Sequence, residues 1–155
     1  MGCSSSGNLL GSRITDGDVL VTAVRFERAS VRLLGAQMQP GEDVAARARE
    51  LALQLKAPDL RHVLALCDGL NVNATQLAEG LNACGASVTG GLAGDADRFQ
   101  TTWVMADGPA RQNQVVLVGL YGDAKVKNIF CTGWTEFGRS EEHTSELQSR
   151  VDISY

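Results

Sequence analysis

Hydrophobic positions along the chain fall into short runs separated by glycine, proline and aspartate, which predicts a mixture of strands and helices. Residues 18–26 (DVLVTAVRF) are rich in valine and partly alternating, and residues 31–38 (VRLLGAQM) follow after a gap of four residues. Two such runs at this spacing predict an antiparallel hairpin. Residues 42–56 then repeat apolar side chains at helical spacing, with acidic residues in the first turn and Lys56 in the last, as the helix dipole favours.

The centre of the chain predicts a β-α-β unit. Residues 60–67 (LRHVLALC) form a nearly continuous apolar run, which is typical of a strand covered on both faces. Asn73 is a favourable N-cap for a helix over residues 74–84, and Gly85 is a suitable stop signal. Residues 86–89 indicate a second short buried strand, so we expect two parallel strands that lie side by side.

Three further runs, residues 100–106, 115–121 and 126–132, predict a meander of antiparallel strands. The whole pattern predicts a mixed α/β (α+β) fold. It has a mixed sheet with one β-α-β unit, an antiparallel meander and two main helices. No internal repeat is detectable in the sequence.

Composition narrows the classes of function. The chain has 155 residues, enough for one domain, and combines a net charge of −4 with only 5% aromatic residues. Such a chain lacks the basic surface and the stacking platforms of a nucleic-acid-binding protein. It contains no apolar run of about 18 residues, the length that would predict a membrane span.

The cysteines indicate a reduced compartment. There are four of them, and they include no C-x-x-C pair: Cys3, Cys67, Cys84 and Cys131. The sequence therefore predicts neither a zinc site nor a disulfide framework, and a cytoplasmic location is the simplest interpretation.

The chain changes character after Gly138. Residues 139–155 (RSEEHTSELQSRVDISY) lose apolar periodicity and closely resemble the translation of a common sequencing adapter, with residues 150–152 in the place of its variable index. We therefore expect a domain over residues 1–138 and a non-native tail over residues 139–155. On this interpretation His143 belongs to no functional site, and the coding sequence continues past Gly138.

Three short glycine-rich segments hold most of the candidate chemistry as hydroxyls, a thiol, carboxylates and backbone amides. They are Gly2-Cys3-Ser4-Ser5-Ser6-Gly7, Asp68-Gly69-Leu70 and Gly90-Gly91-Leu92-Ala93-Gly94-Asp95. Asp68 follows a buried strand, where α/β proteins place ligand-contacting groups, although Asp-Gly is also an ordinary turn pair. The segments predict a small-ligand pocket rather than a face that binds a polymer.

The same residues leave other roles open. The first six residues match an N-myristoylation pattern, with Cys3 placed for palmitoylation. Cys3 could act as a nucleophile beside His62, but His62 lies in an apolar run, which favours a satisfied core histidine. Asp95 and Asp97 could hold a cation, although a solvated turn is the better interpretation. The glycine run from Gly90 lacks the spacing of a nucleotide-binding loop.

Taken in order, these segments resemble the FIST domain, a sensory module of bacterial signal-transduction proteins. The resemblance rests on the cysteine-serine loop, on Leu66-Cys67-Asp68-Gly69-Leu70, on the Gly90-to-Asp95 run with Phe99 and Thr102, and on Thr132-Gly133-Trp134. It covers about residues 2–138. FIST proteins usually have a strand and a helix before the cysteine-serine loop and a second, C-terminal domain. The resemblance therefore implies that this chain is part of an N-terminal FIST domain.

With this resemblance, the leading hypothesis is a non-enzymatic sensory domain; no metal is predicted, and haem is the one cofactor that stays possible. It would bind a small ligand, such as an amino acid, and signal to a histidine kinase, a cyclase or a chemotaxis protein. The implied ligand-binding residues are Cys3, Ser4, Ser5, Ser6, Asp68, Gly69, Gly90, Gly91 and Asp95. Asp68 or Asp95 would pair with an ammonium group. Two alternatives stay open: a haem-based nitric-oxide sensor with His62 or a cysteine as axial ligand, and a hydrolase that uses the Cys3 thiol.

Overall fold

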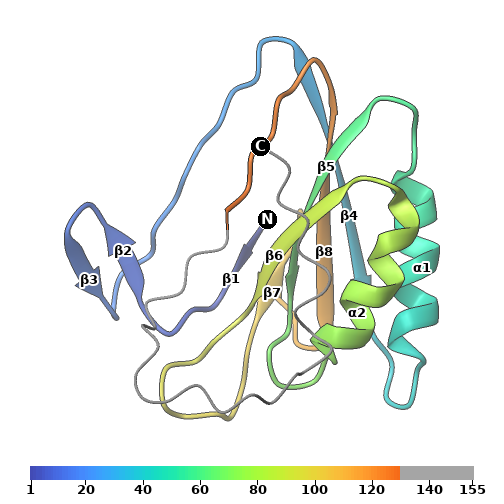
Figure 1. Ribbon diagram of the computed structural model, residues 1–155. Helices are drawn as coiled ribbons and strands as arrows, with labels where there is room; N and C mark the ends of the chain where they lie inside the picture. The colour runs from blue at the N-terminus through green and yellow to red at the C-terminus, as the bar shows by residue number, and fades with distance from the viewer. Residues whose placement is uncertain (130–155) are drawn as a thin grey trace, which may run out of the picture.

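The core of the protein is a four-stranded mixed sheet, seen in a computed structural model that describes residues 1–129. Its strands lie in the order β4-β8-β5-β6 (Figure 1). Their bounds are β4 Ala29–Gln37, β5 Leu60–Cys67, β6 Ser87–Leu92 and β8 Gln114–Gly122. β8 runs antiparallel to both neighbours, whereas β5 and β6 are parallel. This arrangement confirms the mixed α+β fold and its β-α-β unit.

β5 and β8 are central because their sequences are apolar on both faces. Val115, Val116 and Leu117 of β8 are completely buried. One face of the sheet packs against α1 Val44–Leu55 and α2 Ala74–Leu81, which cover the same side (Figure 1). The other face bears a smaller apolar cluster formed by Ala93, Val104 and Val116. The helix-covered face of the central strands is removed from water, whereas the second face is only partly covered and leaves Leu64 of β5 40% exposed.

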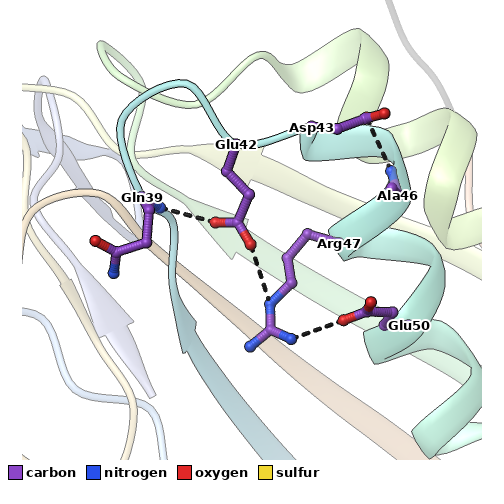
Figure 2. A network of polar contacts seen from close by, with 6 residues as sticks. All are labelled: Gln39, Glu42, Asp43, Ala46, Arg47 and Glu50. Atoms are coloured by element: carbon purple, nitrogen blue, oxygen red, sulfur yellow. Dashed lines mark hydrogen bonds and ion pairs between the residues drawn. The ribbon is translucent and has the colours of Figure 1, made fainter.

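Helix α1 begins at Val44 because Asp43 caps it. The Asp43 carboxylate accepts a hydrogen bond at 3.0 Å from a backbone N–H in the first turn. Glu42 lies outside the helix, where it accepts a hydrogen bond from the N–H of Gln39 at 2.8 Å and pairs with Arg47 at 3.6 Å (Figure 2). The expected acidic first turn is therefore wrong in detail: the two carboxylates fix the entry to the helix from just before it.

The helix predicted at residues 74–84 is present in two parts. Asn73 caps α2 as predicted, and its side chain accepts a hydrogen bond from the N–H of Gln76 at 3.1 Å. The chain continues as the short 3-10 helix η1 Asn82–Cys84 and ends at Gly85. β6 then extends to Leu92, beyond the predicted strand, because its glycine pair continues the pairing with β5.

The strand predicted over residues 18–26 is absent, and the predicted hairpin to residues 31–38 is wrong. A short hairpin forms earlier instead, between β2 Asn8–Leu10 and β3 Arg13–Thr15. β4 pairs with β8 along its length, and residues 18–26 have no strand partner, so Val19 and Val21 stay 89% and 81% exposed. Valine-rich alternation expresses a preference for extended backbone, but a strand also needs a neighbour to pair with.

The predicted antiparallel meander is also wrong. The run at residues 100–106 contains only β7 Val104–Met105, which pairs with β1 Gly2–Cys3 from the start of the chain. The run at residues 115–121 is β8, but its partners are β4 and β5. Residues 126–129 form no strand, whereas residues 130–132 and the tail from residue 139 lie outside the described residues. These pairings join segments distant in sequence, so neighbouring patterns do not predict them.

Candidate functional site

The three glycine-rich segments come together beside the carboxyl ends of β5 and β6, and we call them the loop cluster. The N–H of Ser4 donates to the carbonyl of Trp103 at 2.8 Å, next to the β1–β7 pair. The carbonyl of Ser4 accepts a hydrogen bond from Gly94 at 3.0 Å, which joins the first segment to the third. Ala93 donates to the carbonyl of Cys67 at 2.8 Å, which joins the third segment to the end of β5.

The serine hydroxyls of the first segment help to hold this arrangement. Ser4 Oγ accepts a hydrogen bond from a backbone N–H next to β7 at 3.0 Å, and Ser6 Oγ accepts one from Ala96 at 3.2 Å. Ser5 Oγ donates to the side chain of Asn8 at 3.1 Å. Ser5 and Ser6 are exposed, so their hydroxyls also face solvent. The predicted site serines therefore shape the loops and remain reachable at the surface.

Two glycines allow the segments to approach one another closely. A Cβ atom on Gly69 would overlap the carbonyl oxygen of Ala93, and one on Gly90 would overlap that of Ala65. The N–H of Gly69 donates to the hydroxyl of Thr102 at 3.1 Å. A side chain at Gly69 or Gly90 would force these neighbouring backbone segments apart, so the loop cluster needs glycine at both positions.

Asp68 lies at the centre of the loop cluster, and its side chain is completely buried. Its carboxylate accepts hydrogen bonds from the Thr102 hydroxyl and the Asn113 N–H, both at 2.6 Å, and from the N–H groups of Leu70 and Asn71 at 2.9 and 3.0 Å. The Asn71 side-chain amide donates a further bond at 3.0 Å. Burial raises the pKa of this carboxyl, but the hydrogen bonds outweigh burial and hold the pKa at about 2. The carboxylate stays charged, and protein donors fill its accepting positions.

Asp95 follows β6 as Asp68 follows β5, but its contacts are local. The carboxylate accepts hydrogen bonds from the N–H groups of Gln100, Thr101 and Phe99 at 2.7, 3.0 and 3.1 Å. These bonds, led by the one from Gln100, hold the pKa of Asp95 below its usual value. Asp95 therefore closes its own loop, and its side chain is only 5% exposed.

The thiols of Cys3 and Cys67 are not activated. Partial burial raises the pKa of Cys3, and burial together with the charges of Asp68 and Cys3 raises the pKa of Cys67 to about 11. A nucleophilic cysteine needs a lowered pKa, so this environment disfavours the hydrolase alternative. Cys131 lies outside the described residues.

His62 has the environment of a satisfied core histidine. Its Nδ1 lies 2.8 Å from the Ser87 hydroxyl and its Nε2 lies 2.8 Å from the Thr89 hydroxyl, both on β6. The residue is 8% exposed, and burial lowers its pKa. Because both ring nitrogens are engaged, neither is available to a haem iron or to the Cys3 thiol.

Sequence reasoning assigned no role to three of the residues that hold Asp68. Thr102 contributes to the family resemblance, but it lies 34 positions after Asp68 in the sequence, so no local pattern links the two residues. Asn71 and Asn113 belong to no motif. Asn113 adopts a left-handed backbone with φ of 54°, which asparagine tolerates better than most residues. That tolerance is the only signal that could have drawn attention to it.

A cleft of about 440 Å³ adjoins the loop cluster between α2 and β6. Its walls are mainly alanine, leucine and valine side chains, including Leu77, Ala78 and Leu81. Gly90 and Gly91 line it, whereas the other predicted site residues do not. The described residues contain no group of three or more His, Cys, Asp or Glu side chains that could hold a metal ion.

The FIST N domain family matches residues 1–145 of the chain. The chain belongs to the FIST family. FIST domains form a sensory family of signal-transduction proteins, so this FIST domain is a sensory domain. The match continues past residue 138, and the predicted boundary of the tail stays a prediction. No curated protein and no solved structure matches the chain. Within residues 1–129, no helix is both long enough and apolar enough to cross a membrane.

Proposed function

We propose that this FIST domain binds a small polar molecule, such as an amino acid, beside the loop cluster and acts as a non-enzymatic sensor. The observation that supports this most is a cleft of about 440 Å³ lined by Gly90, Gly91 and Leu92 of the third segment, which backbone hydrogen bonds join to the first segment and to the end of β5. Small-molecule pockets commonly have volumes of about 300–1,000 Å³. The raised thiol pKa values support a binding function over a catalytic one.

The ligand would contact backbone and apolar surface in this cleft. β6 is an edge strand of the four-stranded sheet, so Gly90 and Gly91 can offer N–H and C=O groups that β5 does not use. Leu77 and Leu81 offer an apolar wall on the opposite side. An amphipathic small molecule matches both surfaces.

In this proposal, Asp68 and Asp95 hold the loops in place and do not themselves contact the ligand. The prediction that Asp68 or Asp95 pairs with an ammonium group stays a prediction. Asp68 already accepts bonds from several protein donors, and Asp95 accepts three from its own loop. Cys3, Ser4, Ser5, Ser6 and Gly69 would likewise set the shape of the loops around the ligand.

Signalling requires a partner, which we propose to be a second FIST domain linked to a kinase, cyclase or chemotaxis protein in the cytoplasm. The exposed valines of residues 18–26 support a protein neighbour, because a contiguous exposed apolar stretch is typical of interaction surfaces.

A thermal-shift screen of the twenty amino acids against the wild-type chain tests the ligand site. Ala78→Leu places a larger side chain in the cleft from an exposed position on α2, and Ala46→Leu is a matched change on the exposed side of α1. We expect at least one amino acid to raise the melting temperature of wild type and Ala46→Leu but not of Ala78→Leu. An equal shift in all three proteins would contradict the proposed cleft.

A further inference from the structure

The four-stranded sheet has two edge strands, β4 and β6, and β4 is the longer of the two. β4 pairs with β8 over nine residues in one unbroken register, and no strand within residues 1–129 pairs with its outer side. Natural edge strands are usually short, or proline, a bulge or several charges interrupt them and prevent pairing with other chains. β4 contains neither proline nor a bulge, and Arg32 is its only charged residue. This edge therefore lacks the usual protection against the addition of another strand.

The register with β8 shows which backbone groups of β4 point outward. At the start of β4, the carbonyl of Arg28 accepts a hydrogen bond from Asp123 at 3.3 Å. At its end, Met38 donates to the carbonyl of Asn113 at 2.6 Å, so the even-numbered residues bond to β8. The alternate residues direct their N–H and C=O groups away from the sheet, and these groups have no backbone partner among residues 1–129: Ala29, Val31, Leu33, Gly35 and Gln37. Such a row of donors and acceptors matches another extended strand.

The outer side of β4 is accessible. Val31 is 50% exposed, and Gly35 is exposed as well. Ala106 fills the space where a Cβ atom of Gly35 would stand, so the exposed surface of this glycine is its backbone at the edge. The Arg32 side chain turns towards α1, where its guanidinium donates to the carbonyl of Gln54 at 2.8 Å. The one charge of the strand is therefore held on the helix side of the sheet.

We propose that β4 pairs with β4 of a second copy of this chain, antiparallel and around a two-fold axis at Leu33. The two sheets then form one continuous sheet with β6 at both outer edges. This register pairs all the outward-pointing residues, with Val31 opposite Gly35 of the second copy. A register centred on Arg32 would place two guanidinium groups opposite each other, which is unfavourable.

The charges near the two ends of β4 favour a second copy as the partner. Near its start, four cationic side chains outnumber two carboxylates around a cavity: Arg25, Arg28, Lys125 and Lys127 against Glu27 and Asp123. Beyond its end, three carboxylates outnumber one guanidinium at the entry to α1 (Figure 2): Glu42, Asp43 and Glu50 against Arg47. Antiparallel pairing brings the basic end of each copy towards the acidic end of the other. The two-fold symmetry repeats this match.

The dimer does not depend on the proposed ligand site. The cleft borders β6, which lies at the opposite edge of the sheet from β4. A protein that dimerises but binds no amino acid would contradict only the proposed function. A monomer that binds an amino acid would contradict only the dimer.

Sedimentation equilibrium of the full chain tests the proposal. We expect the mass of two chains at about 100 µM protein and dissociation on dilution, because a single pair of edge strands makes a small interface. A monomer at every concentration would overturn the proposal.

Two substitutions at Val31 test the role of the edge backbone. Val31→Pro removes an outward N–H and no hydrogen bond to β8, and proline is tolerated at an edge position of this kind. We expect it to raise the dissociation constant of the dimer at least about tenfold, since symmetry removes the N–H twice. The matched Val31→Thr keeps the N–H and the branched shape, and should change the constant less than about threefold. Equal dissociation constants for the two variants would overturn the proposal.

Cross-linking tests the register without a proline. In a chain that carries Cys3→Ser and Cys131→Ser, Leu33→Cys should form a disulfide between copies under mild oxidation, because directly opposite Cα atoms lie about 5.5 Å apart. Val31→Cys should not, because the two copies of this residue would lie about 14 Å apart, four residues along the strand. Equal cross-linking at both positions would refute the register.

Charge reversal tests the orientation. Arg25→Glu should weaken the dimer severalfold, because it places a carboxylate near the acidic end of the other copy. The matched Arg49→Glu lies on the flank of α1 beside α2 and should leave the dissociation constant unchanged. Equal effects of the two reversals would refute the antiparallel charge match.

Discussion

Asp68 and Asp95 follow two neighbouring parallel strands, but their carboxylates stabilise different parts of the molecule. Asp68, after β5, is completely buried and joins segments separated by up to 45 residues through Thr102 and Asn113. Asp95, after β6, accepts hydrogen bonds only from residues four to six positions further along its own loop. The central strand ends inside the molecule and the edge strand ends near its surface. Both carboxylates are buried, so the origin of the donors around each one decides whether it holds distant segments together or a single loop.

The largest expected effect comes from Asp68→Asn. The substitution removes the charge and places an amide NH₂ group among several donors, so we expect it to lower the free energy of unfolding by about 3 kcal/mol. Urea unfolding measures this loss. Asp97→Asn, at an exposed position, is the matched control and should change stability by less than about 0.5 kcal/mol. Equal losses of unfolding free energy in the two variants would show that the hydrogen bonds to Asp68 do not stabilise the fold more than an exposed aspartate does.

Acid should reduce the difference between wild type and Asp68→Asn. The pKa of Asp68 falls from 3.8 to about 2 on folding, so the folded state binds this proton less readily than the unfolded chain. The contribution to stability is therefore complete above about pH 4 and is lost as the pH falls towards 2. Its size is at most about 2 kcal/mol, from 1.36 kcal/mol per pKa unit. Urea unfolding at pH 5 and pH 2 should show the gap narrowing by that amount, and a constant gap would contradict the charge-based account.

The smallest effect is expected for Asp95→Asn. Its hydrogen bonds stay within one surface loop, so the melting temperature should fall much less than for Asp68→Asn. The change should instead speed amide hydrogen exchange at Phe99, Gln100 and Thr101. If Asp95→Asn destabilises the whole protein as strongly as Asp68→Asn, the contrast between a global and a local carboxylate is wrong.

Predictions from short sequence patterns were correct where all the interacting residues lie close together in the sequence. Asn73 caps α2 through an N–H three residues away, and the β-α-β unit closes within about thirty residues, so composition and spacing predict both. The same reasoning failed at residues 18–26. Their valines favour extended backbone, but the neighbouring strand β4 pairs with β8 instead.

By itself, the sequence determined the apolar runs of β4, β5 and β8, the two capped helices and the chemistry available in three glycine-rich segments. Periodicity, helix caps and residue type depend on residues only a few positions apart, so a short stretch of sequence is enough to predict them. Only the tertiary structure decided that these segments form one cluster and that the Asp68 carboxylate accepts hydrogen bonds from Thr102 and Asn113. It also buried the Oε1 atom of Gln114 without a hydrogen-bond partner among residues 1–129. These outcomes depend on hydrogen bonds and burial between segments that meet only after folding, because a carboxylate or an amide takes its role from the donors and acceptors around it.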